Sequence, residues 1–518
     1  MANVTPSTRH VVPRWRTFDD ALATGELNSA ETGTQRKADG DHFLKEKEAD
    51  WLLNKTLLFA TDLVSAAHVL GESDVARSAA VYVLENRLDT SPLACRLATS
   101  LLGVSDTSMK LNSAGKIPSA TRDAIRGLKR RRRQEPRNAF VWMDLARLYA
   151  VLGMKEQARQ ALRVAVFLAP FDRFIIRGAA RFYLHDGDPL EALSILRRND
   201  RTSRDPWLMA GEIAVSEVAA RSPKFAKRAE ELLKHGSHAP FHLSEARAAL
   251  ASLKLGSGNV RAAKRLFAEL KDPTDNALAQ AIWAAPEMGQ PAHMPTFTKS
   301  VPAHASEALA LDAQNCGNWE EAFQNAKRWI NDEAFSARPI VFASALASSP
   351  LGKHEEGVQI CRAGLRTNPK HAILTNNMAF SLVESGNPQE AADVLSHVNL
   401  DAVDDISKIC LTATLGLVRY GLGRTEEGRR LYETAIADAE KAKHTRLAAL
   451  ARVYFARGEF RSGNVAAFEI FEQGKRVLEK QGTARELGIC AKVALELTVS
   501  EKPIQFVKAP WLQSPPES

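Results

Sequence analysis

The chain has 518 residues, of which 45% are hydrophobic and 25% charged, and its net charge is +8. This composition is typical of folded soluble proteins and excludes a wholly disordered chain. Because there is neither an apolar run of about 18 residues nor a secretory signal, we expect a cytoplasmic protein with no membrane-spanning helix. The five cysteines are dispersed and odd in number, which indicates free thiols in a reducing compartment.

Residues 1–40 contain turn-forming residues and few periodic apolar residues, so we expect a mobile N-terminal arm. Apolar residues at helical spacing follow, and they predict an N-terminal helical pair, similar to the later repeats, over residues 41–92. Residues 93–137 are predicted to be a linker, because much of this stretch is polar and loop-like. Near its end lies the most basic run of the chain, residues 129–133.

This basic run is a lysine followed by four arginines: Arg130, Arg131, Arg132 and Arg133. Such a run at a helix end is compatible with three roles, namely a solvated helix terminus, contact with an acidic partner, and contact with nucleic-acid phosphates. The wider region, residues 122–181, holds 15 basic and 5 acidic residues, which favours an anionic partner. No aromatic residues alternate with the arginines in the way that base stacking requires.

A repeat of 34 residues is the strongest signal in the sequence, and we expect its first stack over residues 138–281. A tyrosine, a glycine and an alanine recur together in two consecutive units: Tyr149, Gly153 and Ala158, then Tyr183, Gly187 and Ala192. Glycine at a tight turn accepts conformations that strain other residues, and alanine lets two helices approach closely. Each unit therefore predicts two antiparallel helices, which must stack on their neighbours to bury their apolar faces.

A similar spacing returns over residues 303–500, where we expect further repeats and a C-terminal capping helix. Five glycines mark the predicted turns at intervals of 35, 34, 37 and 35 residues: Gly317, Gly352, Gly386, Gly423 and Gly458. Prolines interrupt the pattern at residues 282–302, which form either a long loop within one array or a hinge between two. Residues 501–518 are predicted to be a proline-rich tail.

These spacings resemble those of the tetratricopeptide repeat family. The resemblance implies an all-α fold, a right-handed α-solenoid of stacked antiparallel helix pairs, in which the first helix of each unit lines a concave groove. The groove positions of the first two clear units match Arg147, Arg177 and Arg181. Clustered guanidinium groups in a groove would bind carboxylates or phosphates of a partner. The alternative is a set of surface ion pairs with nearby aspartates: Asp144, Asp172 and Asp186.

A later unit places Asn376, Asn377 and Phe380 at groove positions. They resemble family units in which an asparagine side chain holds the backbone of an extended peptide. The alternative is that Asn376 caps or solvates a helix surface. The family's carboxylate clamp requires lysine and asparagine at set positions in consecutive units. This sequence lacks that combination, so we do not expect capture of C-terminal peptides by such a clamp.

The sequence contains no GxxxxGK[ST], GxGxxG, HExxH or GxSxG motif, so we predict neither an enzyme nor a cofactor. Three neighbouring histidines, His235, His238 and His242, are separated by a glycine and a proline, so we expect exposed loop histidines rather than a metal site. The sequence predicts a protein–protein interaction scaffold or adaptor that binds one or more partner proteins along its groove. The alternative is a nucleic-acid-associated regulatory module that uses residues 122–181.

Overall fold

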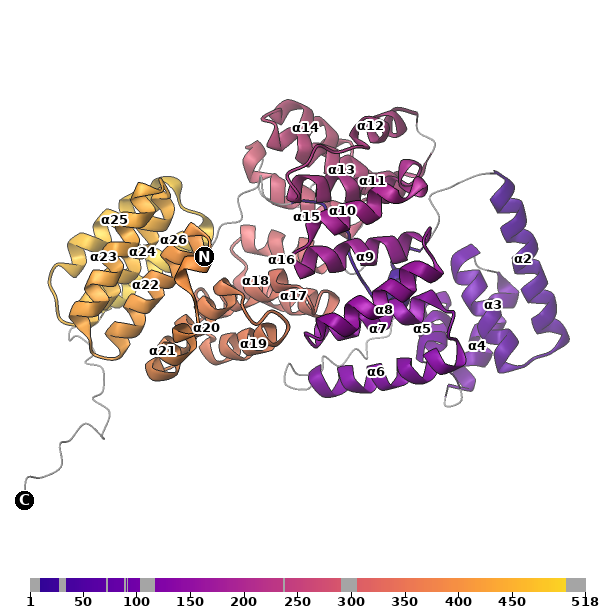
Figure 1. Cartoon of the computed structure of the whole chain (residues 1–518), viewed down its shortest axis with the longest axis horizontal. Helices are drawn as coiled ribbons and strands as arrows, with labels where there is room; N and C mark the ends of the chain where they lie inside the picture. The colour runs from indigo at the N-terminus through magenta and orange to yellow at the C-terminus, as the bar shows by residue number, and fades with distance from the viewer. Residues whose placement is uncertain are drawn as a thin grey trace, which may run out of the picture.

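The computed structural model describes residues 10–27, 34–70, 73–87, 90, 92–102, 117–235, 238–289 and 305–499, and these residues contain helices and turns but no β-strand. From α7 onward, consecutive helices pack against each other as antiparallel pairs joined by short turns (Figure 1). The predicted all-α solenoid of stacked helix pairs is therefore confirmed. The predicted tail, residues 501–518, lies outside the described residues.

The part of the chain before the first stack holds six helices in its described residues: α1 (Phe18–Ala23), α2 (Thr34–Leu53), α3 (Leu57–Leu70), α4 (Asp74–Glu85), α5 (Pro92–Leu101) and α6 (Ile117–Gln134). Helices α2 to α5 form a small bundle with its own buried core around Trp51 and Leu63 (Figure 1). The predicted linker, residues 93–137, is largely helical where it is described. Helix α6 forms there because Ile125, at helical spacing from Leu128, is buried against α7.

The first stack contains nine α-helices in the described residues: α7 (Ala139–Val151), α8 (Lys155–Leu168), α9 (Arg173–Asp186), α10 (Pro189–Arg198), α11 (Pro206–Val218), α12 (Ala226–His235), α13 (Pro240–Gly256), α14 (Val260–Ala268) and α15 (Asp275–Ala284). Short 3-10 helices follow α10 (Asp200–Ser203) and α15 (Pro286–Met288). Turn glycines have the left-handed backbone that the repeat predicts, with φ of +71° at Gly153 and +84° at Gly187.

The second stack follows the proline-rich interruption: α16 (Ser306–Asn315), α17 (Trp319–Asp332), α18 (Ala337–Ser348), α19 (His354–Thr367), α20 (Ala372–Glu384), α21 (Pro388–Ser396), α22 (Asp405–Gly421), α23 (Thr425–Lys441), α24 (Thr445–Arg461), α25 (Ala467–Gln481) and α26 (Ala484–Val499). A 3-10 helix (Leu400–Ala402) precedes α22. The predicted turn at Gly458 is wrong, because α24 continues to Arg461 and Gly463, with φ of +82°, occupies the turn.

The proline-rich interruption at residues 282–302 does not separate the two stacks. Helix α15 before it packs directly on α16 after it, in the same way as other neighbouring helices of the array. Residues 290–304 themselves lie outside the described residues. The array therefore continues from α7 to α26.

The array curves so strongly that α19 contacts α7. We call the closed set of helices from α7 to α19 the first ring. Thr367, the last residue of α19, donates a hydrogen bond from Oγ1 to the carbonyl oxygen of Val151, the last residue of α7, at 2.9 Å. At the same contact a methyl group added to Gly153 would lie 2.7 Å from the carbonyl oxygen of Arg366. Figure 1 shows one end of α7 close to α17 and α19.

Farther along the chain, α24 and α26 come back into contact with α18. We call the helices from α16 to α26 the second ring, which shares α16 to α19 with the first. The Tyr454 hydroxyl of α24 and Oγ of Ser349, at the end of α18, lie 2.8 Å apart. Arg485 of α26 donates to the carbonyl oxygen of Ala345 in α18 at 3.4 Å. The chain therefore encloses two spaces, one inside each ring.

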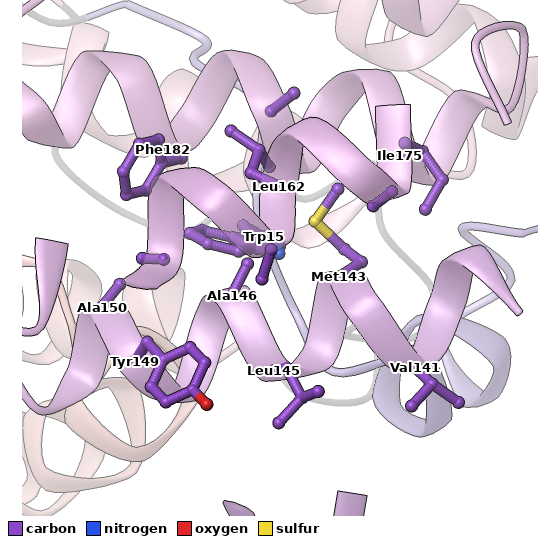
Figure 2. Close-up of a cluster of buried hydrophobic side chains, with 14 of the residues drawn as sticks. Trp15, Val141, Met143, Leu145, Ala146, Tyr149, Ala150, Leu162, Ile175 and Phe182 are labelled. Atoms are coloured by element: carbon purple, nitrogen blue, oxygen red, sulfur yellow. The ribbon is translucent and has the colours of Figure 1, made fainter. Parts of the chain in front are cut away.

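Residues 10–27 occupy the space inside the first ring, although we expected residues 1–40 to be a mobile arm. Trp15 is 1% exposed and Arg16 is 2% exposed. Figure 2 shows Trp15 among the buried side chains of α7 to α9, beside Met143 and Ala146. The expectation is wrong for this segment because its one tryptophan and two flanking arginines find buried partners on distant helices. Residues 1–9 and 28–33 lie outside the described residues.

Candidate functional site

An open pocket of about 580 Å³ lies inside the second ring. The first helices of the pairs line it, namely α16, α18, α20, α22 and α24, together with the final helix α26. These helices face inward because the second helix of each pair packs on their outer side. The volume lies within the range of pockets that hold small molecules or short peptide stretches.

The pocket wall is largely apolar. Apolar side chains that are almost fully buried contribute their exposed edges to the wall. Among them are Ile409 and Leu417 of α22 and Ile489 of α26, which are 3–4% exposed. Phe380 of α20 is half-buried, and its ring meets the ring of Tyr454 edge-on at a centroid distance of 5.4 Å. Such a wall would bind apolar side chains of a ligand through buried area.

Two carboxamides from α20 add polar groups to this wall. Oδ1 of Asn376 accepts a hydrogen bond from Oγ1 of Thr414 at 2.7 Å. Nδ2 of Asn377 donates to Oγ of Ser344 at 3.0 Å. Each asparagine thus ties α20 to a neighbouring inward-facing helix through one polar atom of its carboxamide.

The structure brings together the three residues that the sequence placed at groove positions of this unit. Asn376, Asn377 and Phe380 all line the pocket. Asn377 is only 1% exposed, so a ligand would have to reach the pocket floor to contact it. Their role in binding stays a prediction.

Arg485, in the first turn of α26, is the most unusual polar group of the pocket. Its Nε–H is buried and has no hydrogen-bond partner among the described residues. No carboxylate in the described part of the chain forms an ion pair with it, whereas nearby Arg446 pairs with Glu486 at 3.1 Å. Burial lowers the pKa of Arg485, since desolvation disfavours the charged form. An anionic group on a ligand would offset the desolvation free energy of the Arg485 guanidinium by pairing with it.

The other three predicted partner-binding residues lie inside the first ring, where they contact the chain itself. Arg147 donates from Nη2 to the carbonyl oxygen of Asp332 at 2.8 Å. Arg177 binds Glu245 through two nitrogens, at 2.9 and 3.2 Å. All three arginines are at most 7% exposed. Their groove position was predicted, but they are not open to a partner because residues 10–27 fill the groove.

The alternative interpretation, surface ion pairs of these arginines with three aspartates, is also wrong. Asp172 caps α9 by accepting from the backbone N–H of Ile175 at 3.1 Å. Asp186 pairs instead with Lys155 at 2.9 Å. Arg181 donates to Oγ of Ser336 at 3.0 Å. The arginines are therefore part of a buried polar network rather than of a solvated surface.

The arginines of the basic run lie on α6. Arg130, Arg131 and Arg133 are exposed. Nε of Arg131 pairs with Glu135 at 3.2 Å, and the guanidinium of Arg132 lies 4.8 Å from the ring centre of Trp142. A contact with nucleic acid or with an acidic partner stays a prediction.

The histidines near residue 238 do not share one loop. His235 ends α12, and His242 lies within α13 and is buried 6.0 Å from the ring of Trp207. Burial lowers the pKa of His242 to about 4, so it is neutral at pH 7. In the described residues, no group of three metal-ligating side chains comes together.

Several residues of both rings were not predicted as site residues from the sequence. Arg14, Trp15 and Arg16 lie in the stretch that we expected to be mobile, and Arg485 lies in the expected capping helix. A tryptophan between two arginines was an available signal for the first three, because an exposed indole is unfavourable. No helix in the described part of the chain has the length and hydropathy needed to cross a bilayer.

No protein-family model and no curated protein matches this chain. Among solved structures, a chain of the Naa15/Naa10 complex bound to HypK-THB is similar, with 11% sequence identity and a TM-score of 0.26. The similarity covers 91% of this chain and 83% of that chain. A TM-score this low carries no implication for the function of the present protein.

Proposed function

We propose that this protein is an interaction scaffold of the tetratricopeptide-repeat type that binds an extended segment of another protein inside its second ring. The proposal is for binding without catalysis and without a cofactor. One comparison within the molecule supports it. Both rings are built from inward-facing first helices, and the first ring already holds a segment of the same chain, residues 10–27, of which residues 10–17 form neither helix nor strand.

The chemistry of the second-ring pocket agrees with a peptide ligand. Its apolar wall suits one or two apolar side chains, and the carboxamides of Asn376 and Asn377 suit a peptide backbone, which has both donors and acceptors. Arg485 favours a ligand that also carries an anionic group.

A photo-crosslinking amino acid at Phe380 tests the proposal in cells. We expect crosslinks to one or a few protein segments, because Phe380 faces the pocket. The same amino acid at Phe167, which is 83% exposed on α8, is the control for random contact. The Ala413→Trp variant, which fills the pocket, should abolish the specific crosslinks. Crosslinks that are the same at both positions, or that persist in the filled pocket, would contradict the proposal.

A further inference from the structure

We propose that the channel of the first ring is itself a peptide-binding site, specific for extended segments with an arginine–tryptophan–arginine core, and that residues 10–27 are its resident and exchangeable occupant. This site is separate from the second-ring pocket and does not depend on the function proposed for that pocket.

The ring binds the backbone of the segment through side chains. Three such contacts follow at intervals of three residues: Asn276 Nδ2 donates to the Val12 carbonyl oxygen at 3.0 Å, Arg147 Nε donates to the Trp15 carbonyl oxygen at 3.1 Å, and Asp144 Oδ1 accepts from the Phe18 N–H at 2.9 Å. Residues 10–17 form neither helix nor strand. Side-chain contacts to an extended backbone are the way in which a groove binds a peptide.

The Trp15 side chain sits in a fitted aromatic pocket. Its ring lies 5.2 Å from the ring of Phe335 and 6.0 Å, edge-on, from that of Phe182. Gly178 of α9 makes room for it, since a methyl group there would come within 3.0 Å of the indole. Aromatic anchors in fully desolvated pockets dominate the affinity of peptide and protein ligands.

The two flanking arginines enter an acidic cluster that the ring supplies. Nη2 of Arg14 lies 2.5 Å from Glu307 of α16, and its Nη1 lies 3.2 Å from Asp332 of α17. Nε of Arg16 lies 2.7 Å from the same Asp332, and Arg16 also pairs with Asp275 of α15. Glu307 also pairs with Arg338 of the ring at 2.6 Å, whereas the ion pairs of Asp275 and Asp332 among the described residues are with Arg14 and Arg16. Because buried carboxylates without a cation are unfavourable, an empty channel would select a segment with two positive charges.

The ring closes by contacts that do not involve the segment. The hydrogen bond from Thr367 to Val151 joins α19 to α7 directly, and α15 packs on α16. The helices from α7 to α19 are linked by packing contacts throughout, with α13 packing on both α14 and α15. The framework of the channel is thus a continuous wall of helices, in which the segment is a guest held by side chains.

The test uses the full chain with a protease site introduced between Leu27 and Thr34. After cleavage, a fluorescent synthetic peptide of residues 10–27 is added in excess, and its anisotropy and the release of the unlabelled fragment are followed. We expect the labelled peptide to replace the fragment. A peptide with Trp15→Ala should bind at least about 30-fold more weakly, as for the loss of a buried aromatic anchor. The uncleaved chain should bind little labelled peptide, because its channel is occupied.

Two results would overturn the proposal. One is a cleaved chain that keeps its fragment until denaturant unfolds the ring, and the other is a cleaved chain that loses its helical circular dichroism signal as the fragment leaves. Either result would make the segment part of the core instead of a ligand. A second measurement uses the intact Trp15→Ala chain, whose channel is weakly occupied. If that chain is folded, binding of the wild-type peptide supports the proposal, and no binding at 100-fold excess refutes it.

Discussion

The backbone carbonyl oxygen of Trp15 accepts a hydrogen bond from Nε of Arg147 at 3.1 Å, although 132 residues separate the two in the sequence. Arg147 lies at a groove position, where the sequence predicted contact with a partner peptide. In this protein the position is taken by the chain itself. The first ring is therefore filled in the described structure, and the second ring holds the open pocket.

Replacement of Trp15 by alanine should lower the free energy of unfolding of the first ring by about 3–5 kcal/mol, the usual cost of removing a buried tryptophan. Trp15 is 1% exposed and contacts two aromatic rings. Urea denaturation followed by circular dichroism measures the effect. Phe167→Ala is the control, because Phe167 is 83% exposed. Equal destabilisation in the two variants would show that the burial of Trp15 does not stabilise the folded chain.

Loss of the Glu245 carboxylate should lower the free energy of unfolding, because the charged Arg177 would remain buried without its carboxylate partner. The pair is held by two nitrogen–oxygen contacts at 2.9 and 3.2 Å. Breaking a buried ion pair from one side costs about 3–5 kcal/mol, so we expect Glu245→Gln to lower the thermal unfolding temperature clearly.

The matched control is Glu390→Gln, which breaks the pair of Glu390 with Arg362 on the surface. The two side chains of that pair are 44% and 51% exposed. Its loss should cost less than about 1 kcal/mol. A similar cost for both variants would contradict a structural role for Arg177.

Asp144 should make stability depend on pH. Burial raises the pKa of Asp144 from 3.8 to about 7. The folded protein thus binds the Asp144 proton more tightly than the unfolded chain does. The stabilisation of the fold by protonated Asp144 is therefore fully present below about pH 4 and is lost as the pH rises through about 7. Asp144→Asn cannot ionise but keeps an oxygen that can accept from the Phe18 N–H.

The expected result is a difference between variant and wild type that grows in favour of Asp144→Asn from about pH 4 to pH 7 and is constant above about pH 8. Denaturation midpoints across this range give the measurement. A difference that is independent of pH would show that Asp144 ionises normally in the folded protein.

Two turn glycines provide a test of ring closure. Gly153 and Gly187 both have positive φ, so alanine at either should cost about 1–2 kcal/mol from backbone strain. A methyl group at Gly153 would also lie 2.7 Å from the carbonyl oxygen of Arg366, whereas Gly187 has open space. We therefore expect Gly153→Ala to be more destabilising than Gly187→Ala, and to increase hydrogen exchange at the end of α19. Equal effects would mean that the α7–α19 contact contributes nothing.

The sequence alone determined the helix pairs and the faces that they turn inward. Glycine and alanine at fixed intervals dictate tight turns and close helix contacts, and these are local properties. The resemblance to the tetratricopeptide repeat family placed Asn376 and Phe380 at groove positions, and the structure has them at the second-ring pocket. The turn at Gly458 was misplaced because the length of α24 is set by packing rather than by the repeat.

Only the tertiary structure decided that the array closes into rings and that the N-terminal segment fills the first of them. Arg14 meets Asp332 across 318 residues, and Thr367 meets Val151 across 216. Contacts over such separations leave no periodic pattern, because they depend on the summed curvature of many stacked helix pairs. The same arginines that look like an open binding surface in the sequence are therefore buried partners of the chain's own first residues.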